Sequence, residues 1–134
     1  AMWWRAGRSE WIEGHVEFCA TGTGLRYAIA DAATVPDTAT DTFVLIGSPD
    51  GTPARVRLTA YPSGGAPQVA EFTTDGARTT VWMRQSFPSL VGPYSIDVES
   101  LPIEAAPATP IVVEKAIYRR NLESGAAARA TLLP

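Results

Sequence analysis

The amino-acid sequence predicts an all-β fold, an antiparallel sandwich of about seven to ten short strands. Turn-forming residues recur at short, fairly even intervals, and the runs between them are rich in β-branched and aromatic residues. No stretch shows the 3.6-residue periodicity of an amphipathic helix. The longer segments 31–41 and 101–110 have the length of crossovers between two sheets, whereas an up-and-down barrel would need tight hairpins throughout.

Individual strands are expected wherever a β-rich run lies between two turns. In Arg55 to Thr59 the alternation places Val56 and Leu58 on a core face and both arginines in solvent, and Tyr94 to Glu99 alternates in the same way. Phe43 to Ile46 is apolar in both phases, which is typical of a central strand covered on both sides. The expected strands are 2–5, 11–19, 25–30, 42–47, 54–60, 67–73, 78–84, 93–100, 111–120 and 127–132.

Composition excludes several classes of function. The net charge is -3 and no basic stripe is visible, so nucleic acid is not an expected partner. The longest apolar runs span only a few residues, so the chain should not insert into a membrane. Cys19 is the only cysteine, which excludes an internal disulfide and multi-cysteine metal motifs. We expect no cofactor.

The two ends of the chain resemble each other. Residues 1–6 (AMWWRA) are similar to residues 116–121 (AIYRRN), and Gly14 and Ala20 are similar to Gly125 and Ala130. The spacing is roughly 110 residues, the size of one sandwich domain. We therefore expect residues 1–24 to be the end hairpin of a preceding repeat, or an N-terminal strand extension, and residues 25–134 to be one sandwich domain.

A family resemblance rests on these same segments. Pro110 to Tyr118 and the closing Ala130 to Pro134 resemble the last strands of tandem immunoglobulin-like β-sandwich repeats in large secreted bacterial proteins. Tyr27 to Asp31 is similar to the opening strand of such a repeat, and 43–47 and 55–59 are similar to the next two strands. The resemblance implies a secreted or cell-surface, multi-repeat protein without known catalytic residues.

Residues with catalytic or metal-binding chemistry do not form a recognisable set. His15, Glu17 and Cys19 would share one face of a strand, but ligands spaced this way converge poorly on a tetrahedral metal ion. No Gly-x-Ser-x-Gly elbow accompanies the single histidine. The acidic segment 31–41 is an alternative candidate for a calcium site, but it lacks the residue spacing of a calcium-binding loop. We expect neither a metal site nor catalysis.

Several other polar residues have simple structural interpretations. Asp50-Gly51 and Asp75-Gly76 are expected to form hairpin turns. Lys115 should face solvent or pair with Glu114. Its alternative is an intramolecular isopeptide bond, with Asp97 or Asn121 as the acyl partner. The carboxylates of Asp97 and Glu99 are expected on a solvated strand face.

Aromatic residues are the strongest candidates for an interface. Adjacent residues of a strand point to opposite faces, so Trp3 and Trp4 cannot both enter one core. If Val81 and Met83 face inward, Trp82 faces outward. Exposed rigid aromatics are buried by neighbouring modules and also stack on sugar rings. The candidate interface or ligand-binding residues are Trp3, Trp4, Trp11, Trp82 and Tyr118.

The expected function is that of a non-catalytic structural or adhesive repeat. Its partner would be the neighbouring repeat of the same protein or an identical subunit. In one variant, residues 1–20 of one chain complete a sheet edge of another and build a fibre. The alternative is a carbohydrate-binding module that uses exposed tryptophans.

Overall fold

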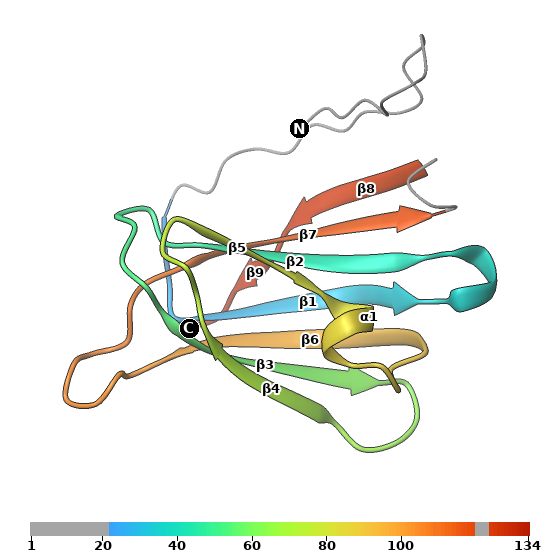
Figure 1. The fold of residues 1–134 in the computed structure, drawn as a ribbon, viewed down its shortest axis with the longest axis horizontal. Coiled ribbons are helices and arrows are strands. Elements are labelled where there is room, and N and C mark those ends of the chain that lie inside the picture. Colours follow the sequence, from blue (N-terminus) through green and yellow to red (C-terminus); the bar gives the residue numbers. More distant parts are fainter. Residues whose placement is uncertain (1–21, 120–123) are drawn as a thin grey trace, which may run out of the picture.

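A computed structural model describes residues 22–119 and 124–134, and this part of the chain forms two antiparallel sheets packed face to face (Figure 1). The five-stranded sheet has the order β4-β3-β6-β1-β9, and the four-stranded sheet has the order β5-β2-β7-β8. The prediction of an all-β, sheet-on-sheet fold is confirmed. The expected strands 2–5 and 11–19 lie outside the described residues. The strands are β1 (Arg26–Thr34), β2 (Asp41–Gly47), β3 (Arg55–Pro62), β4 (Gln68–Thr73), β5 (Arg78–Trp82), β6 (Gly92–Leu101), β7 (Val112–Arg119), β8 (Ser124–Arg129) and β9 (Thr131–Leu132).

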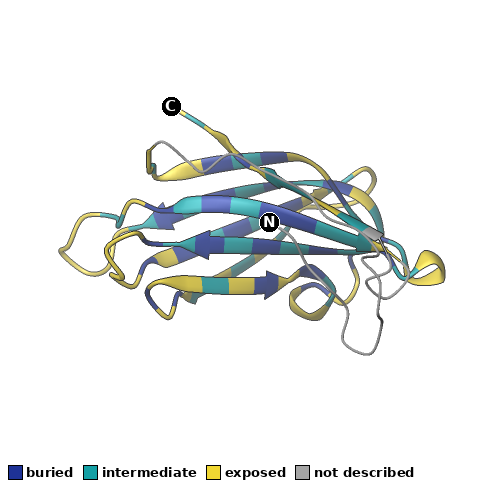
Figure 2. Ribbon diagram, turned by 90° about the horizontal axis from the view of Figure 1, so that it is seen from above, coloured by how far each residue is buried: buried dark blue, intermediate teal, exposed yellow. Residues whose placement is uncertain are grey.

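The core lies between the sheets and follows the alternation of the strands. Buried and more exposed residues alternate along most strands (Figure 2). Val56 and Leu58 are fully buried, as expected, while Arg55 is exposed. In β2 the inward Val44 and Ile46 are fully buried. Each such side chain stabilises the fold by about 1.5–3 kcal/mol through loss of apolar surface to water.

The two Asp-Gly turns connect the sheets, so the expectation of hairpin turns is wrong. Asp50-Gly51 joins β2 to β3 and Asp75-Gly76 joins β4 to β5, and each of these pairs belongs to different sheets. Gly51 and Gly76 have φ of 76° and 96°. The two turns also contact each other, because a Cβ on Gly76 would lie 2.6 Å from the carbonyl oxygen of Gly51. Glycine is therefore required at Gly76 by both conformation and space.

Strand β1 is longer than expected because it contains a bulge. Its pairing with β6 shifts between Ile29 and Ala32, and the two intervening residues, Ala30 and Asp31, are both exposed. The bulge breaks the alternation that a sequence pattern relies on. Beyond it, the strand continues to Thr34 and crosses to β2, as the crossover expected in 31–41 requires.

At the C-terminal end, the single expected strand is two strands in different sheets. β8 pairs with β7, and β9 pairs with β1. Between them the buried Ala130 donates its N–H to the carbonyl of Val113 at 3.0 Å. This segment closes one side of the sandwich.

One short helix follows β5, where the sequence suggested continued strand. α1 (Met83–Ser86) is a single turn, with Phe87 N–H donating to the Met83 carbonyl at 2.9 Å. Met83 and Phe87 are buried, so the turn caps the core as the chain returns to the five-stranded sheet. Within the described residues, no helix has the length and apolar character needed to cross a bilayer.

A buried tyrosine ties the two sheets together. The hydroxyl of Tyr27, in β1, donates to the carbonyl oxygen of Ile111 just before β7 at 2.7 Å. Burial raises the pKa of this phenol, because the charged form would lose its hydration. The hydrogen bond is thus one between neutral groups, and it is structural.

Candidate functional site

Three aromatic side chains form a row across the outer face of the four-stranded sheet. We call Phe43, Trp82 and Tyr118 the aromatic cluster. The Phe43 ring stacks on Trp82, with centroids 5.9 Å apart and planes 14° apart, and meets Tyr118 edge-on at 5.6 Å and 70°. Both geometries are favourable for aromatic pairs. Three different strands, β5, β2 and β7, therefore contribute to one surface feature.

The alternation of each strand places these rings outside the core. Val81 and Met83 are buried, so Trp82 points outward and is 40% exposed. In the strand pairing Phe43 lies directly opposite Trp82 on one side and Ala116 on the other. The small Ala116 leaves room for the rings beside it. The inward direction of Val81 and Met83, on which the position of Trp82 depends, is thus observed.

An ion pair lies beside the cluster. Arg84 is two residues beyond Trp82, and α1 brings its Nε to 2.7 Å from Oδ1 of Asp41, which itself lies two residues before Phe43. The Arg84 guanidinium also donates to the carbonyl of Thr40 at 3.4 Å. The Asp41 side chain is only 17% exposed. An aromatic patch with a partly buried charge pair beside it can pack on a protein or on a sugar ring.

Of the five candidate residues from the sequence, the structure brings two together. Trp82 and Tyr118 both contact Phe43. Trp3, Trp4 and Trp11 lie outside the described residues. Sequence reasoning missed Phe43 as a surface residue because its strand was interpreted as covered on both faces. The available signal was the two-residue spacing between Asp41 and Phe43, which places both on the outer face.

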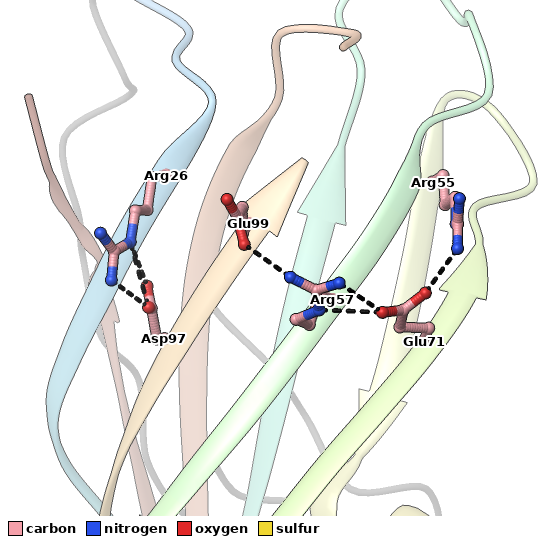
Figure 3. Close-up of polar contacts among 6 residues, drawn as sticks. All are labelled: Arg26, Arg55, Arg57, Glu71, Asp97 and Glu99. Atoms are coloured by element: carbon pink, nitrogen blue, oxygen red, sulfur yellow. Dashed lines mark hydrogen bonds and ion pairs between the residues drawn. The ribbon is translucent and has the colours of Figure 1, made fainter. Parts of the chain in front are cut away.

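The outer face of the five-stranded sheet carries a row of charges instead (Figure 3). Arg57, in β3, binds Glu71 of β4 at 2.8 Å and Glu99 of β6 at 3.4 Å. Arg55 also binds Glu71 at 2.8 Å. We call these four residues, together with the pair Arg26 and Asp97, the charged row. The interpretation of Asp97 and Glu99 as surface carboxylates holds, and both are paired.

Pairing between opposite charges explains the pKa shifts of Glu71 and Arg26 in this row. The Arg26 side chain donates to both oxygens of Asp97, with a shortest distance of 2.6 Å. Hydrogen bonds from Arg57 and then Arg55 lower the pKa of Glu71. The hydrogen bond to Asp97 raises the pKa of Arg26. The row satisfies its own charges, which is the arrangement of a stable solvated surface.

Lys115 does not face solvent and does not pair with Glu114, so that expectation is wrong. Its side chain points between the sheets and is 9% exposed. The ammonium donates to the main-chain carbonyl of Asp31 at 2.7 Å and contacts the Asp31 carboxylate. Of the two proposed isopeptide partners, Asp97 lies on the outer face with Arg26, and Asn121 lies outside the described residues. The bulge of β1 positions Asp31, and a sequence pattern does not reveal this partner.

The acidic segment 31–41 does not gather its carboxylates. Asp31 contacts Lys115, and Asp41 contacts Arg84. Among residues 22–119 and 124–134, no three side chains of the metal-binding types lie close enough to hold an ion. His15, Glu17 and Cys19 lie outside the described residues.

Comparisons with known proteins show a likeness of fold to solved structures. No protein-family model and no curated protein sequence matches this chain. The crystal structure of Thermotoga maritima 1070 is similar with a TM-score of 0.66 and 15% identity, covering 84% of this chain and 97% of that one. The Anabaena sensory rhodopsin transducer is similar with a TM-score of 0.55 and 19% identity, covering 72% of this chain and 99% of that one. At such identities the likeness extends to the fold alone.

Proposed function

We propose that this chain is a non-catalytic structural or adhesive module that packs against a neighbouring copy through the aromatic cluster. The observation that carries the proposal is the contrast between the two outer faces. The charged row pairs its own charges, whereas Trp82 presents a large ring to solvent. Tryptophan and tyrosine are enriched among the residues that contribute most to binding at protein interfaces.

The wider setting that we propose is supported by the sequence. The repeated end segments and the resemblance to immunoglobulin-like tandem repeats favour a secreted or cell-surface protein built from several such modules. In that arrangement residues 1–24 belong to the junction with the preceding module. An interface on the outer face of the four-stranded sheet would then let modules associate without opening the core.

Light scattering coupled to size-exclusion chromatography tests this proposal. We expect the chain to associate at high concentration, and Trp82→Ala to shift it toward monomer. Tyr61→Ala is the matched control, because Tyr61 is 42% exposed on the opposite face. A strictly monomeric chain at every concentration, or equal association of the Trp82 variant, would contradict the proposal.

The strand-complementation variant makes a separate prediction. If residues 1–20 of one chain complete a sheet edge of another, deleting them should abolish association and lower the unfolding midpoint. Association that survives the deletion but not Trp82→Ala would assign the interface to the aromatic cluster alone.

A carbohydrate-binding function is the second candidate, and one observation favours it. Trp82 is backed by Phe43, and the charge pair of Asp41 and Arg84 lies beside them. An aromatic platform next to oriented polar groups is an arrangement that can bind sugars. Titration with polysaccharides should then quench tryptophan fluorescence in the full chain and not in Trp82→Ala. No quenching by any polysaccharide would reject this candidate.

A further inference from the structure

A cleft opens between the two sheets on the side opposite β4 and β5. It lies between the bulge of β1 and the hairpin formed by β7 and β8, and its volume is about 520 Å³. This is within the range of roughly 300–1,000 Å³ of small-molecule sites. It is separate from the aromatic cluster, which is on the outer face of the same sheet. The cleft is lined by Asp31, Lys115, Ile117, Arg119, Gly125, Ala126, Ala127 and Ala128.

The cleft exists because the inner face of the hairpin carries small residues on β8. In the strand pairing, Ala126 lies opposite Ile117 and Ala128 lies opposite Lys115. Elsewhere the space between the sheets is filled by larger side chains such as Ile46 and Leu58, both fully buried. Alanine and glycine leave the space beside Lys115 unfilled.

The charges around the cleft are not balanced. The Lys115 ammonium has three protons to donate, and two of its contacts are to Asp31. Arg119 is exposed and forms no ion pair with any residue in 22–119 or 124–134. The Asp31 side chain remains 83% exposed. Among the described residues that line the cleft, two cations and one carboxylate leave a surplus of one positive charge.

We propose that this cleft binds a small hydroxylated carboxylate, namely a sugar acid. The Arg119 guanidinium matches a carboxylate with two parallel hydrogen bonds. The exposed oxygen of Asp31 accepts hydrogen bonds from hydroxyls, and Lys115 donates to them. A single negative charge on the ligand balances this surplus of the described lining residues, whereas a neutral sugar does not.

Isothermal titration calorimetry of the full chain tests this site with D-galacturonate and with D-galactose, which has a hydroxymethyl group in place of the carboxylate. We expect galacturonate to bind at least tenfold more tightly, and the difference to shrink in high salt. Trigalacturonate distinguishes the source of the ligand. Tighter binding of the trimer indicates a polysaccharide, and equal binding indicates the free acid.

Two variants tie binding to the cleft. Arg119→Gln should weaken galacturonate binding at least tenfold, and Ala126→Phe should weaken it by filling the cleft without changing any charge. Arg78→Gln, an exposed arginine on β5, is the matched control and should bind normally. Equal affinity for galactose, no binding of either acid, or unchanged binding by Arg119→Gln would overturn the proposal. Binding seen only after deletion of residues 1–20 would also overturn it, because that segment would then be the occupant.

Discussion

The two outer faces of this sandwich cover the same core with different side-chain contacts. On the five-stranded sheet, Arg57 lies between Glu71 and Glu99, and each charge in the row has a partner on a neighbouring strand. On the four-stranded sheet, Phe43 lies between Trp82 and Tyr118, and the contacts are between rings. Charges keep their water while they pair, but an exposed tryptophan gains by losing water to a partner. The proposed self-association through the aromatic cluster rests on this difference.

Phe43→Ala is expected to have the largest effect on this comparison. Phe43 supports both other rings, so its removal leaves them without their shared neighbour. We expect the free energy of unfolding in urea to fall by roughly 2 kcal/mol, below the value of about 3–5 kcal/mol for a fully buried phenylalanine. We also expect self-association to be lost.

Leu45→Ala controls for truncation on the same strand and face. It should lower stability and leave association intact, because Leu45 is not in the aromatic cluster. Equal loss of association in both variants would mean that the whole face, and not the aromatic cluster, makes the interface.

Arg57→Gln should have a smaller effect, and one that depends on salt. It removes the central charge of the row, but the ion pairs on both sides of it are exposed to solvent. We expect a stability loss several times smaller than that of Phe43→Ala, decreasing as salt is added. Chromatography should show association unchanged. A salt-independent loss would show that Arg57 acts through packing of its side chain.

The smallest expected effect is a pH dependence that originates in Glu71. Its pKa is lowered in the folded state by hydrogen bonds from Arg57 and Arg55. A lowered folded-state pKa contributes stability above the unfolded-state pKa, and this contribution is lost as the pH falls through the folded-state pKa. The unfolding midpoint should therefore fall on acidification, and less steeply in Arg57→Gln.

Asp50 is expected to contribute a second, independent part of the pH dependence of stability. A hydrogen bond from the Ser48 hydroxyl, followed by one from the Thr52 N–H, lowers its pKa too. Some loss of stability in acid should thus persist in Arg57→Gln. Identical acid profiles for the two proteins would show that Glu71 contributes nothing to the pH dependence.

The sequence predicted what depends on local pattern. Two-residue alternation correctly placed Val56 and Leu58 in the core and Arg55 in solvent, and it gave the direction of Trp82. Alternation also identified most strands within a few residues. It fails at the bulge of β1, where Ala30 and Asp31 are exposed in succession.

Contacts between residues that are far apart in the sequence could not be predicted. Lys115 is buried because its ammonium donates hydrogen bonds to the carbonyl and the carboxylate of Asp31, 84 residues away. The turn at Asp50-Gly51 has the composition of a hairpin, and only the sheet order shows that it joins two sheets. The spacing from Asp41 places Phe43 on the outer face, but only its neighbours on β5 and β7 show that it joins Trp82 and Tyr118 there. The alternation of residues along a strand indicates which face a side chain lies on, whereas the order of strands in the sheets determines which residues it contacts.

Hydroxyl-radical footprinting over a concentration series tests the contrast between the faces most directly. Trp82 and Tyr61 have nearly equal exposure, 40% and 42%, and lie on opposite outer faces, so each serves as the reference for the other. We expect the oxidation rate of Trp82 to fall as the chain associates, while that of Tyr61 stays constant. Protection of Tyr61 and not of Trp82 would contradict the account, as would rates that remain unchanged for both residues at every concentration.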